Sequence, residues 1–416
     1  MKIPHLRWWI VALIFGASVL NYIDRQALSI LAPTIQKDLA LTNEDYATVA
    51  NLFLVAYTIA SLLSGKVVDK LGVRVSLALF VGWWSVANIL TGFARTVGSL
   101  GACRFMLGLG EAGNWTAAPK AVAEWFPARE RGIAIGIYTL GATLGATIAP
   151  ILVVGLATRY GWQAAFAVTG AVGLLWLVPW LWLYRRPAEH PRLSDAERAL
   201  IEQGQKVDAS AEVADTAGWG QGWRIFARRE IWLLIFGRML TDPVWYFFQF
   251  WFAKYLYDSR GLDQKQITVT WVIYLAADIG VLSGGLLSGL LIKRGATPPV
   301  GRLRTMLICA ALVPCAALIP HAGSVSLVLA LGMVAIFAHL AWLVNLSALI
   351  VDLVPRPSLG FAFGVIATGS SLGGMMMNKA VGSLVTHASY DPAFSLMLLL
   401  HPLAWLLLWT LRPRKV

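Results

Sequence analysis

The chain has 416 residues, of which 58% are hydrophobic and only 13% carry a charge. Soluble domains are about 45–50% apolar with glycine included and about 25% charged, so this composition excludes a soluble globular protein, a disordered chain and a secreted disulfide scaffold. Lys and Arg outnumber Asp and Glu by 34 to 22, which gives a formal net charge of +12 whose meaning depends on where the basic residues lie.

Apolar stretches of roughly 18–28 residues recur along the chain, and each is long enough to cross ~30 Å of hydrocarbon as a helix. Twelve stretches are predicted to do so: 8–32, 46–66, 75–94, 97–119, 131–157, 163–184, 230–256, 266–292, 304–320, 325–351, 359–386 and 392–411. We therefore expect an all-α membrane protein. The first stretch is interrupted at Asn21–Arg25, which favours an uncleaved span over a signal peptide.

The basic residues indicate which way the chain is oriented. If both termini are cytoplasmic, the inner segments hold 24 of the 34 Lys and Arg, the outer segments hold five, and the remaining five lie within spans. Because basic residues concentrate on the cytoplasmic side of membrane proteins, this asymmetry predicts a multi-pass protein of the bacterial inner membrane with both termini inside. The surplus charge then faces anionic lipid, and we expect no nucleic-acid partner.

One long hydrophilic stretch divides the chain. Residues 185–229 lie between the sixth and the seventh predicted span, and Ser194–Glu197 is typical of a helix start. This predicts a bundle of six helices over 1–184, a cytoplasmic linker over 185–229 and a second bundle of six helices over 230–416. The two halves are expected to be repeats, and a short basic turn with glycine follows both the second and the eighth span.

The cysteines and histidines give no sign of a metal site or of an enzyme. The three cysteines, Cys103, Cys309 and Cys315, lie in apolar stretches without pairing or ligand spacing, and we expect buried free thiols. The six histidines are scattered, at positions 5, 190, 321, 339, 387 and 401. We therefore expect no metal, no cofactor and no catalytic constellation.

Two predicted spans carry ionisable residues. The first holds Asp24 and Arg25 side by side, and the fourth holds Arg104 and Glu111. Seven positions separate Arg104 from Glu111, which places them on one face of a helix, ~10 Å apart. Ionisable groups at membrane depth are costly and face a cavity by default, so all four are functional candidates. The alternative is that they form static ion pairs that stabilise helix packing.

The charges of these four residues sum to zero, and this suggests a mechanism. With both acids ionised, the arginines are neutralised internally and an anion gains little by entering. Protonation of Asp24 and Glu111 leaves a charge of up to +2, which attracts a carboxylate, a group that arginine binds in a bidentate manner. Proton and anion are therefore expected to bind together and to cross together.

The loop after the second span carries a recognisable motif. Residues 65–74 read GKVVDKLGVR and fill every fixed position of G-x-x-x-D-[RK]-x-G-x-[RK]. With this loop in a chain of six plus six spans, the protein resembles the major facilitator superfamily over essentially its whole length. The resemblance implies two six-helix bundles, and it gives Asp69 and Arg74 a gating role through ion pairs that hold the halves together in the outward-facing state. The alternative is a basic loop without a gating role.

Five further segments carry a narrower resemblance, namely 22–25, 104–114, 124–131, 241–246 and 276–278. Together, in this order, they are similar to the anion:cation symporter family, which includes the hexuronate and hexonate transporters. The resemblance implies that Asp24 and Glu111 bind protons. It also implies that Arg25 and Arg104 serve substrate binding and coupling.

Polar and aromatic side chains in the spans are the remaining binding candidates, since aromatic faces pack on the C–H groups of sugars while amides and phenols bond to hydroxyl groups. In the first half these are Tyr22, Tyr57 and Asn114, and in the second half Trp245, Tyr246, Trp342, Asn345 and Asn378. Packing roles explain any one of the tryptophans equally well, because the chain has 19 of them.

The sequence thus predicts a proton-coupled symporter that imports a small organic anion, foremost a sugar acid such as a hexuronate or hexonate, by alternating access. Import of an aromatic or dicarboxylic acid stays open as an alternative. So does exchange of organic anions or sugar phosphates, although titratable acids in the spans argue against an exchanger. The expected partners are the anion, protons and the lipid bilayer, and the chain is expected to act as a monomer.

Overall fold

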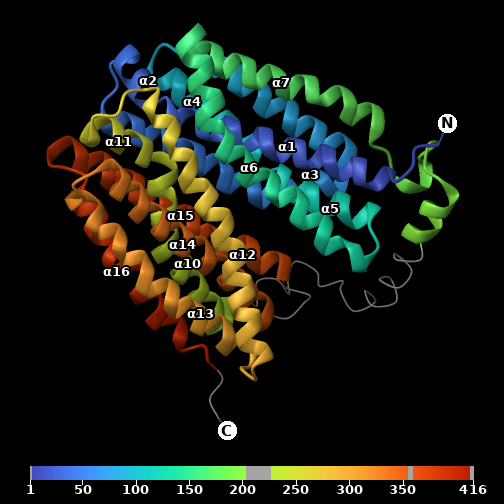
Figure 1. Ribbon diagram of the computed structural model, residues 1–416. Coiled ribbons are helices and arrows are strands. Elements are labelled where there is room, and N and C mark those ends of the chain that lie inside the picture. Colours follow the sequence, from blue (N-terminus) through green and yellow to red (C-terminus); the bar gives the residue numbers. More distant parts are fainter. Residues whose placement is uncertain (1, 203–225, 355–358, 413–416) are drawn as a thin grey trace. The chain divides into compact units, whose positions relative to one another are not determined.

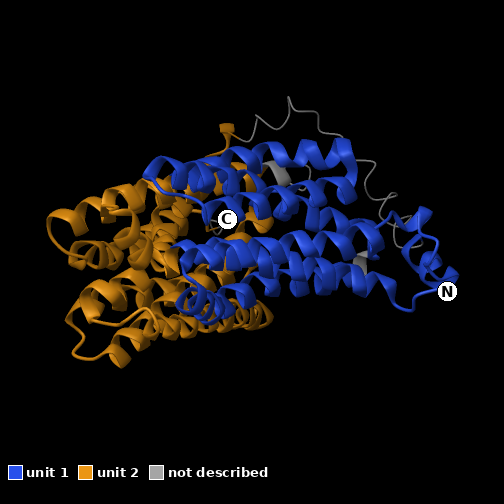
Figure 2. Ribbon diagram, turned by 90° about the horizontal axis from the view of Figure 1, so that it is seen from above, with its two compact units in different colours: residues 1–28, 52–216 blue, residues 29–51, 217–416 orange. Residues whose placement is uncertain are grey.

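The computed structural model describes residues 2–202, 226–354 and 359–412. Every regular element in these ranges is a helix (Figure 1). By contacts the chain separates into two compact units, one of residues 1–28 and 52–216 and the other of residues 29–51 and 217–416 (Figure 2). The expectation of an all-α protein is confirmed for the described residues.

The first unit is built from long helices. They are α1 (Leu6–Ile30) up to residue 28, α3 (Asn43–Thr91) from residue 52, α4 (Val97–Glu111), α5 (Asn114–Trp125), α6 (Ala128–Tyr160) and α7 (Trp162–Leu183), followed by the short 3-10 helix η1 (Pro187–Glu189). A further helix begins at residue 195 and continues to residue 202, where this described range ends. It lies where Ser194–Glu197 predicts a helix start.

The second unit holds the other helices. They are α2 (Ala32–Leu39), α10 (Arg229–Phe250), α11 (Phe252–Arg260), α12 (Trp271–Lys293), α13 (Pro298–Leu312), α14 (Val325–Leu353), α15 (Leu359–His387) and α16 (Asp391–Trp409), with the 3-10 helices η3 (Gln266–Thr270) and η4 (Val313–His321). The predicted bundles 1–184 and 230–416 stay a prediction. The contact-based units group residues 29–51 with the later part of the chain.

Within the described residues, eight helices are long and apolar enough to cross a membrane. One of them, α3, has 49 residues and contains both the second and the third predicted span. The predicted spans 97–119 and 230–256 are each divided between two helices, α4 with α5 and α10 with α11. The span predicted at 359–386 coincides with α15.

Gly72 separates the two spans that lie in α3. Its backbone has φ 73° and ψ 162°, a region that is essentially open only to glycine. This residue is the second fixed glycine of the 65–74 motif, so the motif demands glycine there for a backbone reason. The chain turns at Gly72 and can begin a new helix at once.

A second glycine allows the close approach of α6 to α1. A Cβ added to Gly145 would lie 2.4 Å from the carbonyl oxygen of Val19, which is far inside van der Waals contact. Small residues at helix interfaces let backbones approach in membrane proteins. This contact fixes the stretch of α1 that precedes Asp24, and packing accounts for the glycine.

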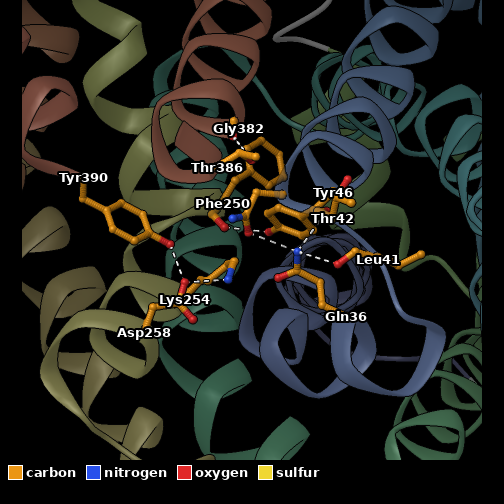
Figure 3. A network of polar contacts seen from close by, with 11 residues as sticks. Gln36, Leu41, Thr42, Tyr46, Phe250, Lys254, Asp258, Gly382, Thr386 and Tyr390 are labelled. Atoms are coloured by element: carbon orange, nitrogen blue, oxygen red, sulfur yellow. Dashed lines mark hydrogen bonds and ion pairs between the residues drawn. The ribbon is translucent and has the colours of Figure 1, made fainter. Parts of the chain in front are cut away.

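Within the second unit, hydrogen bonds join residues 29–51 to the later helices (Figure 3). The buried hydroxyl of Tyr46 donates to the carbonyl oxygen of Phe250 at 2.6 Å. Asn378 Nδ2 donates to Asn51 Oδ1 at 3.1 Å. Gln36 Nε2 donates to the carbonyl oxygen of Thr42 at 3.0 Å, which ties α2 to the start of α3.

Beside these bonds lies a cavity of about 460 Å³, lined among others by Lys37, Lys254 and Asp258. Lys254 pairs with Asp258 one helical turn later, and the hydroxyl of Tyr390 donates to the same carboxylate at 2.8 Å (Figure 3). Burial, and next the charge of Asp258, raise the pKa of Tyr390 well above its ordinary value, so this hydroxyl stays a donor.

Candidate functional site: a buried charge cluster in the first unit

The first unit brings two of the predicted intramembrane charges into direct contact. Arg25 Nε of α1 donates to Glu111 Oε2, at the end of α4, at 2.8 Å. The Glu111 side chain is fully buried and that of Arg25 is 10% exposed. Within the described residues, the other carboxylate oxygen of Glu111 has no hydrogen-bond partner. Helices α1 and α4 thus hold an ion pair in which Glu111 Oε1 has no hydrogen-bond partner among the described residues.

Aromatic rings surround the guanidinium of Arg25. Its central carbon lies 4.8 Å from the ring centre of Tyr22, 5.3 Å from that of Phe53 and 4.8 Å from that of Tyr57. A guanidinium is planar and weakly hydrated, so it stacks well on aromatic faces. The rings therefore hold Arg25 in place without neutralising its charge. Tyr22 and Tyr57 were predicted as binding residues, whereas Phe53 was not, because a phenylalanine in an apolar stretch is indistinguishable from a packing residue.

Asp24, the neighbour of Arg25 on α1, is held by neutral groups. Its side chain is fully buried, and its Oδ1 accepts a hydrogen bond of 2.7 Å from Asn88 Nδ2 of α3. The same amide donates to Thr169 Oγ1 of α7 at 2.8 Å. The second carboxylate oxygen, Oδ2, has no hydrogen-bond partner in the described parts of the chain. Asp24 and Glu111 therefore have different surroundings, one amide-bonded and one paired with arginine.

Sequence reasoning missed Asn88 and Thr169. A signal for Asn88 was present, because a lone amide in the middle of the apolar stretch 75–94 needs a polar partner. The identity of that partner could not be read from the sequence, since Asp24 lies 64 positions away. Thr169 carried a weaker signal, because a threonine in a helix can bond to its own backbone.

Arg104 contacts the backbone of Asp24. Its Nη1 donates to the carbonyl oxygen of Asp24 at 3.4 Å, and its guanidinium lies 5.0 Å from the ring centre of Phe166. With 2% exposure the side chain is buried. The four predicted charges thus gather in one cluster. Arg25 is paired with the carboxylate of Glu111, and Arg104 is bonded to the backbone carbonyl of Asp24.

Asn114 follows the break between α4 and α5. Its Nδ2 donates to Ser18 Oγ of α1 at 3.2 Å, and the residue is fully buried. The adjacent Trp115 packs edge-on against Tyr22, with ring centres 6.2 Å apart. These contacts place Asn114 beside the aromatic groups around Arg25, and its binding role stays a prediction.

The candidates of the second unit serve packing contacts. Asn345 Nδ2 donates to the carbonyl oxygens of Gly284 and Ala341, at 2.9 and 2.8 Å, so this amide joins α12 to α14. Asn378 Oδ1 accepts from Trp251 Nε1 at 3.0 Å, in addition to the bond with Asn51 described above. Both amides are buried, and their substrate roles stay predictions.

The three aromatic candidates lie on two helices. Tyr246 of α10 stacks on Phe250 with ring centres 6.0 Å apart. Trp245 of the same helix stacks on His339, and Trp342 of α14 packs edge-on against His401. Two of the candidates therefore border a pair of buried histidines, which the sequence presents as scattered residues.

The predicted gating residues make their contacts inside the first unit. Asp69 Oδ1 lies 2.6 Å from Lys120 Nζ, and 76% of the Asp69 side chain is exposed. Arg74 donates to the carbonyl oxygen of Leu181, at the end of α7. Both residues flank the turn at Gly72, and their gating role stays a prediction.

Comparisons with known proteins identify the family of the chain. A family model described as Major Facilitator Superfamily matches residues 14–345. The hexuronate transporter of Escherichia coli K12 is 31% identical over 416 residues, covering 100% of this chain and 96% of that protein. The galacturonate transporter of Dickeya chrysanthemi is 34% identical over 285 residues, covering 68% of this chain and 82% of that protein.

Solved structures share the fold at lower identity. A bacterial homolog of the human lysosomal transporter Spinster, in an inward-facing and unoccupied conformation, has a TM-score of 0.75 at 19% identity and covers 98% of this chain and 96% of that one. The xylose transporter XylE from E. coli has a TM-score of 0.71 at 13% identity and covers 98% of both chains. The predicted fold is confirmed, and the chain is a multi-pass membrane transporter rather than an enzyme. By its sequence match over most of its length and by its helical fold, the chain belongs to the Major Facilitator Superfamily.

Proposed function

We propose that the chain is a proton-coupled symporter that imports a sugar acid, a hexuronate or hexonate, by alternating access. Relatives named as hexuronate, galacturonate and D-galactonate transporters are 29–34% identical to this chain. These substrates share one carboxylate and several hydroxyl groups. The orientation proposed with this function has both termini in the cytoplasm, because the basic residues concentrate on that side.

The Arg25–Glu111 ion pair carries this proposal. A substrate carboxylate and the Glu111 carboxylate compete for the same guanidinium. When Glu111 takes up a proton, its attraction for Arg25 falls and a substrate carboxylate can replace it. Removing one partner of a buried ion pair costs about 3–5 kcal/mol. A bound anion therefore stabilises the buried charge of Arg25 most when Glu111 has been neutralised. Proton and anion therefore promote each other's binding.

The surroundings of Arg25 suit a sugar. The rings of Tyr22 and Tyr57 flank the guanidinium and carry hydroxyl groups. Their faces can contact C–H groups of a substrate while their hydroxyls bond to its hydroxyl groups. A sugar acid would thus place its carboxylate on Arg25 and its ring or chain among these side chains. An aromatic acid could use the same faces but would leave the hydroxyl partners unused.

Asp24 offers a second proton site in the same unit. Its carboxylate is held by Asn88, which can remain bonded whether or not Asp24 is protonated, because Oδ2 is the oxygen left to receive the proton. If both acids are loaded with one monoanion, the cycle carries net positive charge inward. Transport would then respond to the membrane potential as well as to the pH gradient.

Uptake by proteoliposomes tests the function. Purified protein is reconstituted, and accumulation of labelled galacturonate, galactonate, benzoate and succinate is measured with and without an inward proton gradient, with a sodium gradient as the control. Gradient-driven accumulation of a sugar acid supports the proposal. Uptake indifferent to the proton gradient contradicts symport, and preference for benzoate or succinate contradicts the substrate class. Uptake only against a preloaded anion would indicate an exchanger instead.

A further inference from the structure

Two histidines that lie far apart in the sequence form a buried pair in the second unit. His339 Nδ1 of α14 and His401 Nε2 of α16 are 3.1 Å apart, a hydrogen-bonding distance. Both side chains have 0% exposure. The pair lies within predicted spans, where ionisable groups are functional candidates by default. None of the steps proposed above uses it.

The chemistry of imidazole determines the state of the two ring nitrogens that do not take part in the bond between the rings. A neutral imidazole has one N–H donor and one acceptor nitrogen. One ring must donate to the other, and the two outer nitrogens, His339 Nε2 and His401 Nδ1, then differ. One of them carries a hydrogen and the other a lone pair, whichever ring is the donor. Neither atom has a hydrogen-bond partner among the described residues.

The open lone pair is a proton acceptor. A proton delivered by a hydronium ion can bind it without breaking the N–H···N bond between the rings, and the products are water and an imidazolium bonded to a neutral imidazole. A purely structural link between two helices would use a pair of amides or hydroxyl groups equally well. Two imidazoles differ from such a link because one of them can gain a charge by taking up a proton on its free lone pair.

The groups around the pair suit a positive charge. Trp245 of α10 stacks on His339, with ring centres 6.3 Å apart and an angle of 8° between the planes. Trp342 packs against His401 with ring centres 5.2 Å apart, at 72°. Indole faces attract cations more strongly than other aromatic side chains do. Both tryptophans were predicted as binding residues, and here they also contact the histidine pair.

Charged and titratable groups lie on the neighbouring helices α10, α12 and α13. On α10, Asp242 lies one turn before Trp245 and Arg238 lies about two turns before it; the two form an ion pair of 2.7 Å, and both interact electrostatically with His339. On α12, the ring of Tyr274 contacts Trp245. On α13, the basic residues are Arg302 and Arg304 near its start, and Arg302 lies 3.6 Å from Asp352 of α14. The Asp242 carboxylate is therefore the acidic group that acts on His339.

We propose that the His339–His401 pair is a proton-binding site of the second unit, which takes up one proton on an outer nitrogen of one of the two rings. It is separate from the carboxylates Asp24 and Glu111 of the first unit. The proposal does not depend on which anion the protein carries or on whether transport is coupled to protons. It makes the second unit responsive to pH through the contact of α14 with α16 and with Trp245.

Nitrogen NMR of the full chain in lipid bilayers tests this site. With ¹⁵N-labelled histidine, the six residues are followed from about pH 9 down to about pH 5, across the range in which histidines titrate. Neutral and protonated imidazole nitrogens have distinct shifts. The signals of the buried pair are assigned by elimination, using His5→Gln, His190→Gln, His321→Gln and His387→Gln, which leave the pair unchanged, and then by His401→Gln.

The expected result is that the pair gains one proton in this range, and that His401→Gln alters the titration of His339. His321 and His387 are exposed and serve as internal references outside the buried pair. If both rings of the pair stay neutral down to the pH at which the protein unfolds, the proposal is wrong and the pair is a structural link. Because the spectrum is recorded without a substrate, this outcome is independent of the uptake experiment.

Discussion

Arg25 Nε lies 2.8 Å from Glu111 Oε2 in the buried interior of the first unit, and these two residues come from different helices, 86 positions apart. The guanidinium donates here to a single carboxylate oxygen, although its geometry allows two parallel bonds to a carboxylate. Its Nη2 also donates to Asn21 Oδ1, in a long hydrogen bond of 3.4 Å. A second anion can therefore approach the N–H groups that do not face Glu111 before the bond to Glu111 breaks. This geometry leads to the first two predictions.

Glu111→Gln should abolish accumulation driven by a proton gradient. The amide keeps the size of the side chain and can still contact Arg25, but it cannot take up and release a proton. Exchange of labelled for unlabelled substrate at equal pH on both sides should persist, because it requires no net proton transfer. Both rates are measured in the same proteoliposomes.

The matched control for this variant is Glu44→Gln. Glu44 is an exposed carboxylate in the first turn of α3. This change should leave accumulation and exchange at the level of the unmodified protein. Normal gradient-driven accumulation by Glu111→Gln would assign Glu111 a structural role and would refute its part in proton coupling.

Arg25→Lys should weaken substrate binding although it keeps the charge. Lysine lacks the planar group that three aromatic rings surround, and it cannot donate in a bidentate manner. A hydrogen bond to a charged group contributes about 1.5–3 kcal/mol, which corresponds to roughly 10–100-fold in apparent affinity. Competition binding of the sugar acid measures this loss. Arg95→Lys, at an exposed turn, is the control, and equal affinity in both variants would contradict the proposed contact.

Much of this architecture could be predicted from the sequence, for a physical reason. Lipid cannot bond to backbone groups, so each spanning segment must be an apolar helix, and such helices are visible in the hydropathy. The same reasoning singles out Asp24 and Glu111, because a charge inside an apolar stretch is conspicuous. The 65–74 motif could be recognised since Gly72 adopts a backbone conformation open essentially to glycine alone.

Contacts between helices could not be predicted in this way. Nothing in the apolar stretch 75–94 says that Asn88 bonds to Asp24, because helix rotation and neighbour choice depend on the packing of the whole bundle. The break between Glu111 and Asn114 was missed for the same reason, since its residues continue an apolar helical pattern. The His339–His401 pair is the clearest case, because two residues 62 positions apart appear unrelated until the fold is known.

Gly72→Ala should destabilise the first unit. At φ 73° and ψ 162° a side chain meets its own backbone, and such conformations cost of the order of 1–3 kcal/mol. The midpoint of thermal unfolding in detergent should fall by several degrees. Gly65→Ala in the same motif is the control, because no atom lies within 4 Å of its added Cβ and alanine favours a helix. Equal midpoints for the two variants would contradict a backbone role for Gly72.

Acidification should loosen the segment that follows α7. His190 Nε2 donates to the carbonyl oxygen of Leu183 at 2.9 Å, while its Nδ1 accepts from the backbone N–H of Arg192 at 3.1 Å, so the bond to Arg192 needs a neutral ring and is lost on protonation. Burial lowers the pKa of His190 below its ordinary value of 6.5, and the nearby Arg185 lowers it further.

The sign of the pH effect follows from that lowered pKa. The unfolded segment binds a proton near pH 6.5 and the folded segment only at lower pH, so the stabilisation is complete above about pH 6.5 and is lost as the pH falls below it. Hydrogen–deuterium exchange of residues 183–201 should therefore be faster at about pH 5.5 than at about pH 7.5, after correction for the intrinsic rate. His190→Gln should remove this difference, whereas His321→Gln, an exposed histidine elsewhere, should retain it. An unchanged pH dependence in His190→Gln would show that another group controls this segment.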